Sequence, residues 1–199
     1  RNFEAFTQWV GETADFIRSL DPNHLISTGN EGLKGSIEST ETYLNIHRFA
    51  NIDYLTAHLW VLNWSWYDPL EPEATYPEAE RKAIDYLDRH IAFAEELGKP
   101  LVLEEFGLAR LWEPLHHIHD PDSPTTLRDL FYAAMFEEVF ASVLAGGPAA
   151  GDNFWAWSGQ GRPGDAWTGD PPHETPGWYS VYDADESTLA VISTHAFEM

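Results

Sequence analysis

The stretch "PLVLEEFG", residues 100–107, is an apolar run that ends in two adjacent glutamates, an aromatic residue and a glycine. A short apolar run with turn residues at its ends is typical of a buried β-strand. Side chains alternate along a strand, so we expect Val102 and Glu104 on one side and Leu103 and Glu105 on the other. A side chain at the last strand position can point into a site at the strand end, which makes Glu105 a candidate for chemistry.

Around this run, helical and strand-like patterns alternate along the chain. We expect a helix at 3–20, a strand at 24–28, a helix from Tyr43 to Phe49, a strand at 52–60, a helix at 77–97, a strand at 101–105, a helix at about 125–145, a strand at 153–157, and then a long loop and a short tail. Each pair of successive strands is separated by enough chain for a helical crossover. This order predicts a parallel sheet.

Several predicted strands end in turns rich in polar and aromatic residues, namely "GNEG", "HLW", "EEFG" and "WAWSG". Parallel folds place their sites at the carboxyl ends of strands, both in (β/α) barrels and in open doubly wound sheets. The chain has no glycine-rich phosphate loop of the nucleotide-binding kind. This absence favours the α/β barrel, of the (β/α)8 TIM-barrel type, over the open sheet.

Composition excludes several classes of protein. The 199 residues are enough for one domain, and a net charge of −22 argues against a nucleic-acid partner. The absence of cysteine excludes disulfides and thiolate metal sites. No stretch reaches the roughly 18 apolar residues of a membrane span, so no span is expected. The first ten residues lack the pattern of a signal peptide and read as the continuation of a longer chain.

Two side chains at strand ends could carry chemistry. Glu105 could act as a nucleophile, or it could merely flank the strand end and pair with a base such as Arg110. His58 ends its strand, with Trp60 on the same side two residues later. We expect His58 to donate a hydrogen bond to the nucleophile or to a substrate hydroxyl, although a lone histidine is often a satisfied polar residue of the core.

Nine tryptophans are present, and Trp9 on the first helix is expected in the core. The flat indole ring suits the apolar face of a sugar, so a concentration in loops after strands favours a carbohydrate groove. The tryptophans in or beside such loops are Trp60, Trp64, Trp66, Trp112, Trp155, Trp157, Trp167 and Trp178.

The loop that contains His116, His117 and His119 could suggest a metal site, but its spacing fits no known ligand pattern, and a solvated loop is the better interpretation. The chain also lacks a Gly-x-Ser-x-Gly elbow and a His-Glu-x-x-His motif. We therefore expect neither a metal nor a cofactor.

The segments "IRSLDPNHLISTGNEG" (17–32), "NIDYLTAHLWVLNWSWYD" (51–68), "GKPLVLEEFGLAR" (98–110) and "NFWAWSG" (153–159) match one family in order and spacing. Together they resemble glycoside hydrolase family five, and within it the endo-β-1,4-mannanases. The resemblance implies an eight-stranded (β/α) barrel that hydrolyses β-glycosides with retention by means of two glutamates. It also implies a polysaccharide substrate, β-mannan or glucomannan, cleaved at internal bonds.

The resemblance assigns roles to individual residues. Glu105 matches the nucleophile, His58 matches a histidine near it, and Glu104 is expected to be a supporting residue. Trp60 stands where many relatives have a tyrosine, and Trp155 resembles the tryptophan beneath the cleaved sugar.

The remaining sugar-binding residues are predicted in the same way. Glu31 resembles a residue that binds sugar on the leaving-group side. Trp64 and Trp157 complete the set that we expect to bind substrate.

One motif of the family is missing. The acid/base glutamate lies in an Asn-Glu-Pro motif at the end of the fourth strand, and this chain contains no such motif. We therefore expect residues 1–199 to form the C-terminal half of the barrel, strands five to eight, and to pair with a missing N-terminal half or with a second copy. Glu31 is a conceivable replacement acid, although "GNEG" follows a later strand.

Three alternatives stay open. The chain could be a non-catalytic sugar-binding fragment, another β-glycanase of the family, or an exo-acting β-mannosidase. From the polymeric substrate we expect a secreted or periplasmic parent enzyme.

Overall fold

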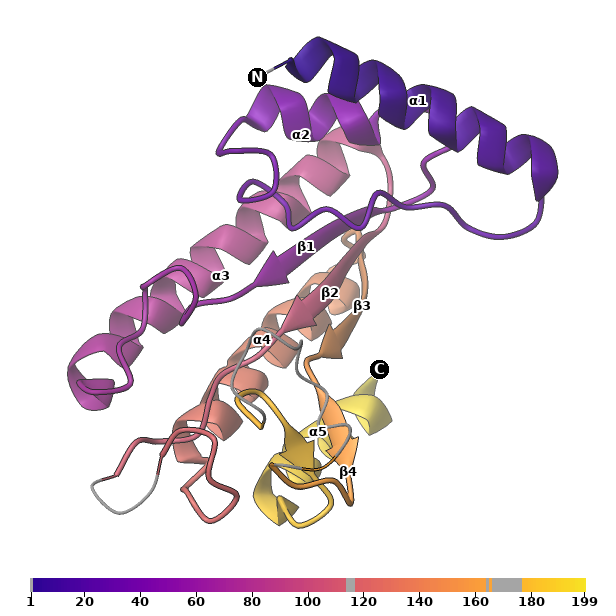
Figure 1. Ribbon diagram of the computed structural model, residues 1–199. Helices are drawn as coiled ribbons and strands as arrows, with labels where there is room; N and C mark the ends of the chain where they lie inside the picture. The colour runs from indigo at the N-terminus through magenta and orange to yellow at the C-terminus, as the bar shows by residue number, and fades with distance from the viewer. Residues whose placement is uncertain (1, 114–116, 164, 166–176) are drawn as a thin grey trace.

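The computed structural model describes residues 2–113, 117–163, 165 and 177–199. Its centre is a parallel sheet made of β1 (Leu55–Leu59), β2 (Leu101–Phe106) and β3 (Ala149–Phe154), in the order β1-β2-β3 (Figure 1). β2 lies in the middle, so the strand with the paired glutamates has a neighbour on both sides. The parallel arrangement confirms the prediction drawn from alternating helices and strands.

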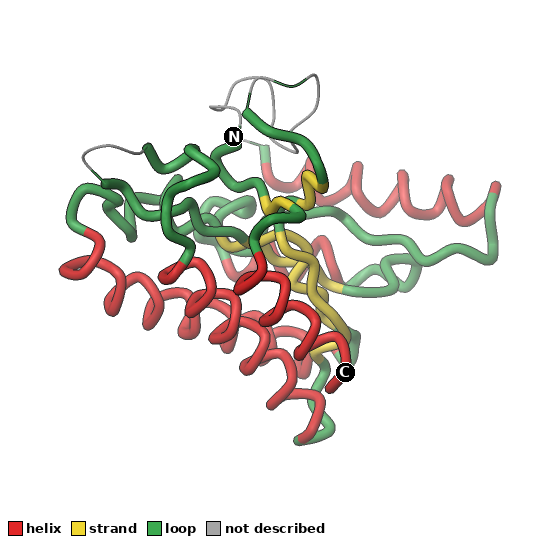
Figure 2. Tube along the Cα trace, turned by 90° about the horizontal axis from the view of Figure 1, so that it is seen from below, coloured by secondary structure: helices red, strands yellow, loops and turns green. Residues whose placement is uncertain are grey.

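Helices precede, connect and follow these strands. The helices are α1 (Phe3–Leu20), α2 (Thr40–His47), α3 (Pro72–Leu97), which joins β1 to β2, α4 (Thr126–Leu144), which joins β2 to β3, and α5 (Glu186–Glu198). The last three lie side by side along one face of the sheet (Figure 2). α3 ends at Gly98, whose backbone is left-handed with φ of 63° and whose N–H donates to the carbonyls of the last turn, as the sequence predicts.

The core lies between the sheet and this helical layer. Leu101 and Leu103 of β2 are buried there, and so is Phe106. The Phe106 ring packs against Tyr132 and Phe136 of α4 at centroid distances of 5.1 and 5.5 Å. Burial of such side chains stabilises the fold by about 1.5–3 kcal/mol each.

The segment at 24–28 is extended beside β1, but it is not a strand. Most of its hydrogen bonds to the segment before β1 involve side chains. The Asp53 carboxylate accepts from the Ile26 N–H at 2.6 Å, and the Ser27 hydroxyl donates to the Tyr54 carbonyl at 3.3 Å. One backbone bond, from the Asp53 N–H to the Ile26 carbonyl, joins them directly. The prediction of a strand at 24–28 was therefore wrong.

Other boundaries also differ from the prediction. α3 begins at Pro72, inside the expected loop, because proline is compatible with the first helical turn. The last strand of the main sheet is β3, and β4 (Trp157–Gly159) pairs instead with β5 (Val181–Tyr182) in a second, two-stranded sheet. Helix α5 replaces the expected tail.

The outer face of α1 is rich in exposed apolar side chains, and the prediction that Trp9 is buried was wrong, because its side chain is 59% exposed. The other large apolar side chains exposed on α1 are Phe3, Phe6, Phe16, Ile17 and Leu20. No helix among the described residues is both long enough and apolar enough to span a bilayer.

Candidate active site

The candidate site lies at the carboxyl ends of β1 and β2. Parallel pairing places His58 of β1 opposite Glu105 of β2, and Leu59 opposite Phe106. Two side chains that are 47 positions apart in the sequence thus become neighbours across one ladder. The sheet therefore brings together the two residues that we predict to be catalytic.

A β-bulge at Glu104 turns both glutamates to the same side. Ala57 pairs with Leu103 and His58 with Glu105, so Glu104 is an extra residue on β2. Without it, Glu105 would follow Leu103 toward the helices; with it, Phe106 takes that buried position. The expectation that the two glutamates point to opposite sides was wrong, because alternation holds only in a regular strand.

The His58 ring lies between the two carboxylates. Its Nε2 is 3.1 Å from Oε2 of Glu104, and its Nδ1 is 3.2 Å from Oε2 of Glu105. The His58 side chain is 10% exposed, and the side chains of both glutamates are 30% exposed. A neutral imidazole donates from one nitrogen, whereas a protonated ring donates from both, so a charged His58 would satisfy both glutamates at once.

The surroundings raise the pKa of the Glu105 carboxyl above its usual value. Burial is the largest cause, and the negative charges of Glu104 and Glu31 act in the same direction, while His58 opposes them. Glu31 therefore lies close enough to influence the candidate nucleophile. Its backbone carbonyl also accepts from the Tyr86 hydroxyl at 2.7 Å, which fixes the turn that carries it.

Three aromatic rings pack together near Gly107, which follows β2. The rings of Trp60 and Trp155 lie 6.3 Å apart and nearly perpendicular, and the Tyr179 ring is 5.0 Å from Trp60. Gly107 lets these groups approach, because a Cβ there would lie 2.7 Å from the Trp155 carbonyl oxygen. The structure thus joins two of the tryptophans that we predict to bind sugar.

Trp64 and Trp157 occupy different surroundings. Trp64 packs against Trp66 and Tyr86, with ring centroids 5.0 and 5.2 Å away, and the Lys34 ammonium lies 5.5 Å from its ring. Trp157 on β4 is 52% exposed. The contacts of these two tryptophans leave their predicted roles untested.

Other sequence-based candidates separate from the site. Arg110 does not pair with a glutamate; its guanidinium donates to both carboxylate oxygens of Asp185 at 2.7 and 2.6 Å. His117 and His119 stack with ring centroids 5.5 Å apart, while His116 and Trp167 lie outside the described residues. Within the described ranges, no cluster of three or more His, Cys, Asp or Glu side chains could hold a metal ion.

Sequence reasoning missed Tyr179, which is buried beside Trp60 and whose hydroxyl donates to the Asn63 side-chain oxygen. The adjacent aromatic residues Trp178 and Tyr179, which follow a stretch of sequence rich in Gly and Pro, could have pointed to it.

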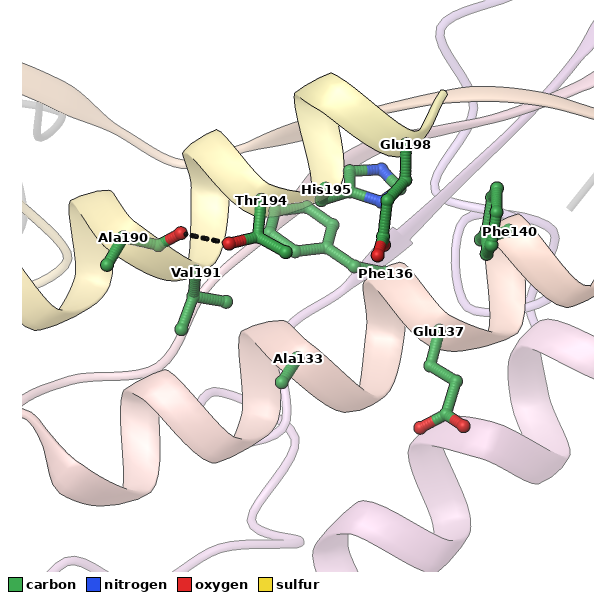
Figure 3. A pocket seen from close by; sticks show the side chains of 9 residues that line it. All are labelled: Ala133, Phe136, Glu137, Phe140, Ala190, Val191, Thr194, His195 and Glu198. Atoms are coloured by element: carbon green, nitrogen blue, oxygen red, sulfur yellow. Dashed lines mark hydrogen bonds between the residues drawn. The ribbon is translucent and has the colours of Figure 1, made fainter.

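A pocket of about 530 Å³ lies elsewhere, between α4 and α5 (Figure 3). There the His195 ring stacks on Phe136 at 4.2 Å, and its Nε2 lies 2.7 Å from the Asp152 carboxylate. The pocket is on the helical side of the sheet, so it does not form part of the candidate site.

Comparison with known proteins identifies a family. Residues 1–199 match the family described as "GH family 5 beta-mannosidase-like". A putative mannan endo-1,4-beta-mannosidase 4 from Arabidopsis thaliana is 30% identical over 207 residues, covering 96% of this chain and 45% of the relative. Mannan endo-1,4-beta-mannosidase 4 from Solanum lycopersicum is 27% identical over 167 residues, covering 79% and 38%.

Solved structures give the same result. A glycoside hydrolase family 5 mannosidase from Rhizomucor miehei superposes with a TM-score of 0.86 at 36% identity, covering 96% of this chain and 47% of that structure. An endo-1,4-beta-D-mannanase from Thermotoga petrophila gives a TM-score of 0.65 at 22% identity, covering 98% and 52%.

These relatives are TIM-barrel enzymes, which confirms the predicted fold class. The chain spans about half, or less, of the length of the relatives that it matches, so its sheet and helices correspond to part of a barrel.

Proposed function

The chain belongs to glycoside hydrolase family 5, in its β-mannosidase-like group, and we propose that it supplies the nucleophile half of the active site of a retaining hydrolase of β-1,4-mannosides. The observation that carries this proposal is the contact of His58 with Glu105 at the ends of two adjacent parallel strands.

In this mechanism, a Glu105 carboxylate oxygen attacks the anomeric carbon of the sugar. The bond from that carbon to the leaving oxygen breaks, and the leaving oxygen takes a proton from an acid. Water then attacks the glycosyl-enzyme, gives its proton to the same acid/base group, and releases Glu105 as a carboxylate. Retaining enzymes hold the two carboxyl groups about 5–5.5 Å apart.

We propose that the acid/base group comes from an N-terminal half barrel. Glu104 and Glu31 are the described acids whose charges act on Glu105, and Glu104 is engaged by His58. The exposed apolar face of α1 supports a covering partner, because a contiguous face of that kind marks an interaction surface. A second copy of the chain is the alternative partner.

The proposed substrate is β-mannan or glucomannan, cleaved at internal bonds. Curated relatives are named mannan endo-1,4-beta-mannosidases, and one structure of the Rhizomucor miehei mannosidase holds mannosyl-fructose. Trp60 and Trp155 would stack against the sugar, with Trp64 and Trp157 farther along the chain of the polysaccharide and Glu31 on the leaving-group side. A polymer of this kind lies outside cells, so we propose a secreted or periplasmic enzyme.

An exo-acting β-mannosidase is the second candidate. The Rhizomucor miehei mannosidase superposes with a TM-score of 0.86, whereas the endo-mannanases from Thermotoga petrophila and Rhizomucor miehei give 0.65 and 0.64. Product length separates the two modes, because exo-action releases mannose alone and endo-action releases a series of oligosaccharides.

The test of the proposal uses dinitrophenyl β-mannoside, whose leaving group departs without a proton, beside glucomannan, whose leaving group needs one. We expect the 199-residue chain to release dinitrophenol and Glu105→Gln to lose at least 100-fold of that rate. Turnover of glucomannan is expected once the N-terminal half of the Rhizomucor miehei mannosidase is added.

Glu95→Gln, a change of the same kind on the exposed face of α3, is the matched control and is expected to keep the wild-type rate. Equal rates in Glu105→Gln and wild type would refute the nucleophile. Glycan binding without turnover of either substrate would favour a non-catalytic sugar-binding fragment.

A further inference from the structure

We infer that Glu104 is a positioning residue, whose carboxylate holds the His58 ring and its protons so that Nδ1 faces Glu105. The inference rests on the proposed function, since it concerns the group that supports the nucleophile. It extends that function to a residue that does not touch the reacting atoms.

The bulge makes the arrangement possible. In a regular strand, only Glu104 would face the ring, and Glu105 would point into the helical layer between β2 and α4. The extra residue places both carboxylates against one imidazole, each within 3.2 Å of a different ring nitrogen. A ring held at both nitrogens cannot rotate without breaking a contact.

The turn "GNEG" runs past Glu104. A Cβ on Gly29 would lie 4.0 Å from the Oε2 atom of Glu104. Gly29 has φ of 60°, in the left-handed region that glycine adopts without strain.

The charges around His58 explain why a carboxylate is needed at this position. The described charged groups that act at this point are Glu104 and Glu105 from β2 and Glu31 from the turn. Glu104 raises the pKa of Glu105 by direct repulsion, so on its own it would hinder the nucleophile. Through His58 it acts in the opposite direction, because its contact with Nε2 keeps Nδ1 turned toward the Glu105 carboxylate.

The direct test follows the His58 ring by ¹⁵N-detected NMR in wild type and in Glu104→Gln. Glutamine keeps the size and one acceptor oxygen of Glu104 but has no charge. We expect the hydrogen-bonded N–H signals of His58 to move and to exchange faster with water, because the ring loses the charged acceptor that lies 3.1 Å from Nε2. The His58→Asn variant assigns the signals, and Glu95→Gln is the control that leaves them unchanged.

The kinetic test uses dinitrophenyl β-mannoside. We expect Glu104→Gln to release dinitrophenol in the first turnover about tenfold more slowly than wild type at pH 7.5, with the half-saturating substrate concentration changed less than twofold. Glu104→Asp, which keeps the charge, is expected to recover part of this rate.

Unchanged His58 N–H signals and exchange rates in Glu104→Gln would overturn the inference. The NMR measurement needs no turnover, so it tests the role of Glu104 separately from the proposed function.

Discussion

Two buried histidines, His47 and His90, predict a loss of stability in mild acid. Both side chains are completely buried, and burial lowers the pKa of each from 6.5 to about 4. Each ring is held in its neutral form by its partners. In His90, Nδ1 donates to the Tyr86 carbonyl at 2.6 Å and Nε2 accepts from the Leu33 N–H at 3.0 Å.

His47 is arranged in the same way. Its Nδ1 donates to the Tyr43 carbonyl at 2.8 Å, and its Nε2 accepts from the Thr28 hydroxyl at 2.8 Å. A proton on Nε2 of His90 would displace a backbone donor, and a proton on Nε2 of His47 would force the Thr28 hydroxyl to turn and accept.

The sign follows from where protons bind. Between pH 6.5 and about 4 the unfolded chain binds a proton at each histidine and the folded chain does not, so stability is lost as pH falls through this window. At pH 5, about 1.5 units below the unfolded pKa, each histidine costs about 2 kcal/mol relative to pH 8, and the two together cost about 4 kcal/mol.

Urea unfolding at pH 8 and pH 5 measures this difference. The double variant His47→Gln, His90→Gln keeps a donor and an acceptor at each position but cannot titrate, so it is expected to lose about 4 kcal/mol less than wild type. His24→Gln is the control on the surface, where the side chain is 86% exposed. An equal pH dependence in wild type and in the double variant would refute the reasoning.

Two further predictions concern ionic groups away from the site. Asp185→Asn is expected to cost about 3–5 kcal/mol in urea unfolding, because the guanidinium groups of Arg110 and Arg128 both donate to this buried carboxylate; a loss below 1 kcal/mol would contradict it. Lys99→Met is expected to cost about 1–3 kcal/mol, because the Lys99 ammonium donates to the carbonyls of His47, Phe49 and Ile52 at 2.6–2.7 Å. Lys99→Arg should not recover the lost stability, because a planar guanidinium cannot direct three donors from one atom. Full thermal stability of the arginine variant would contradict the role given to these three carbonyls.

Local patterns in the sequence predicted most elements and the parallel direction of the sheet, but not the register of its strands. The apolar run of β2 and the stop at Gly98 are local, so they were found. The bulge depends on how β1 meets β2, and no pattern within one strand records it. The segment at 24–28 has the composition of a strand, yet the side chains of Asp53 and Ser27 take over most of its bonds.

The candidate site was predicted in part for the same reason. Glu105 and His58 stand at strand ends, where a parallel sheet brings residues together, and motif and position agree there. Tyr179 contacts Trp60 from a distant part of the chain, and the stretch of sequence before it carries no regular pattern. Contacts of this kind follow from tertiary packing and not from local periodicity.

Covalent trapping of the glycosyl-enzyme can identify Glu105 as the nucleophile. A 2-deoxy-2-fluoro-mannosyl fluoride forms the glycosyl-enzyme with a leaving group that needs no acid, and its fluorine slows release, so the 199-residue chain is sufficient for the measurement. Mass spectrometry of the digested protein is expected to find the sugar on Glu105 and none in Glu105→Gln. A label on Glu104 or Glu31, or the same label in the variant, would contradict the assignment.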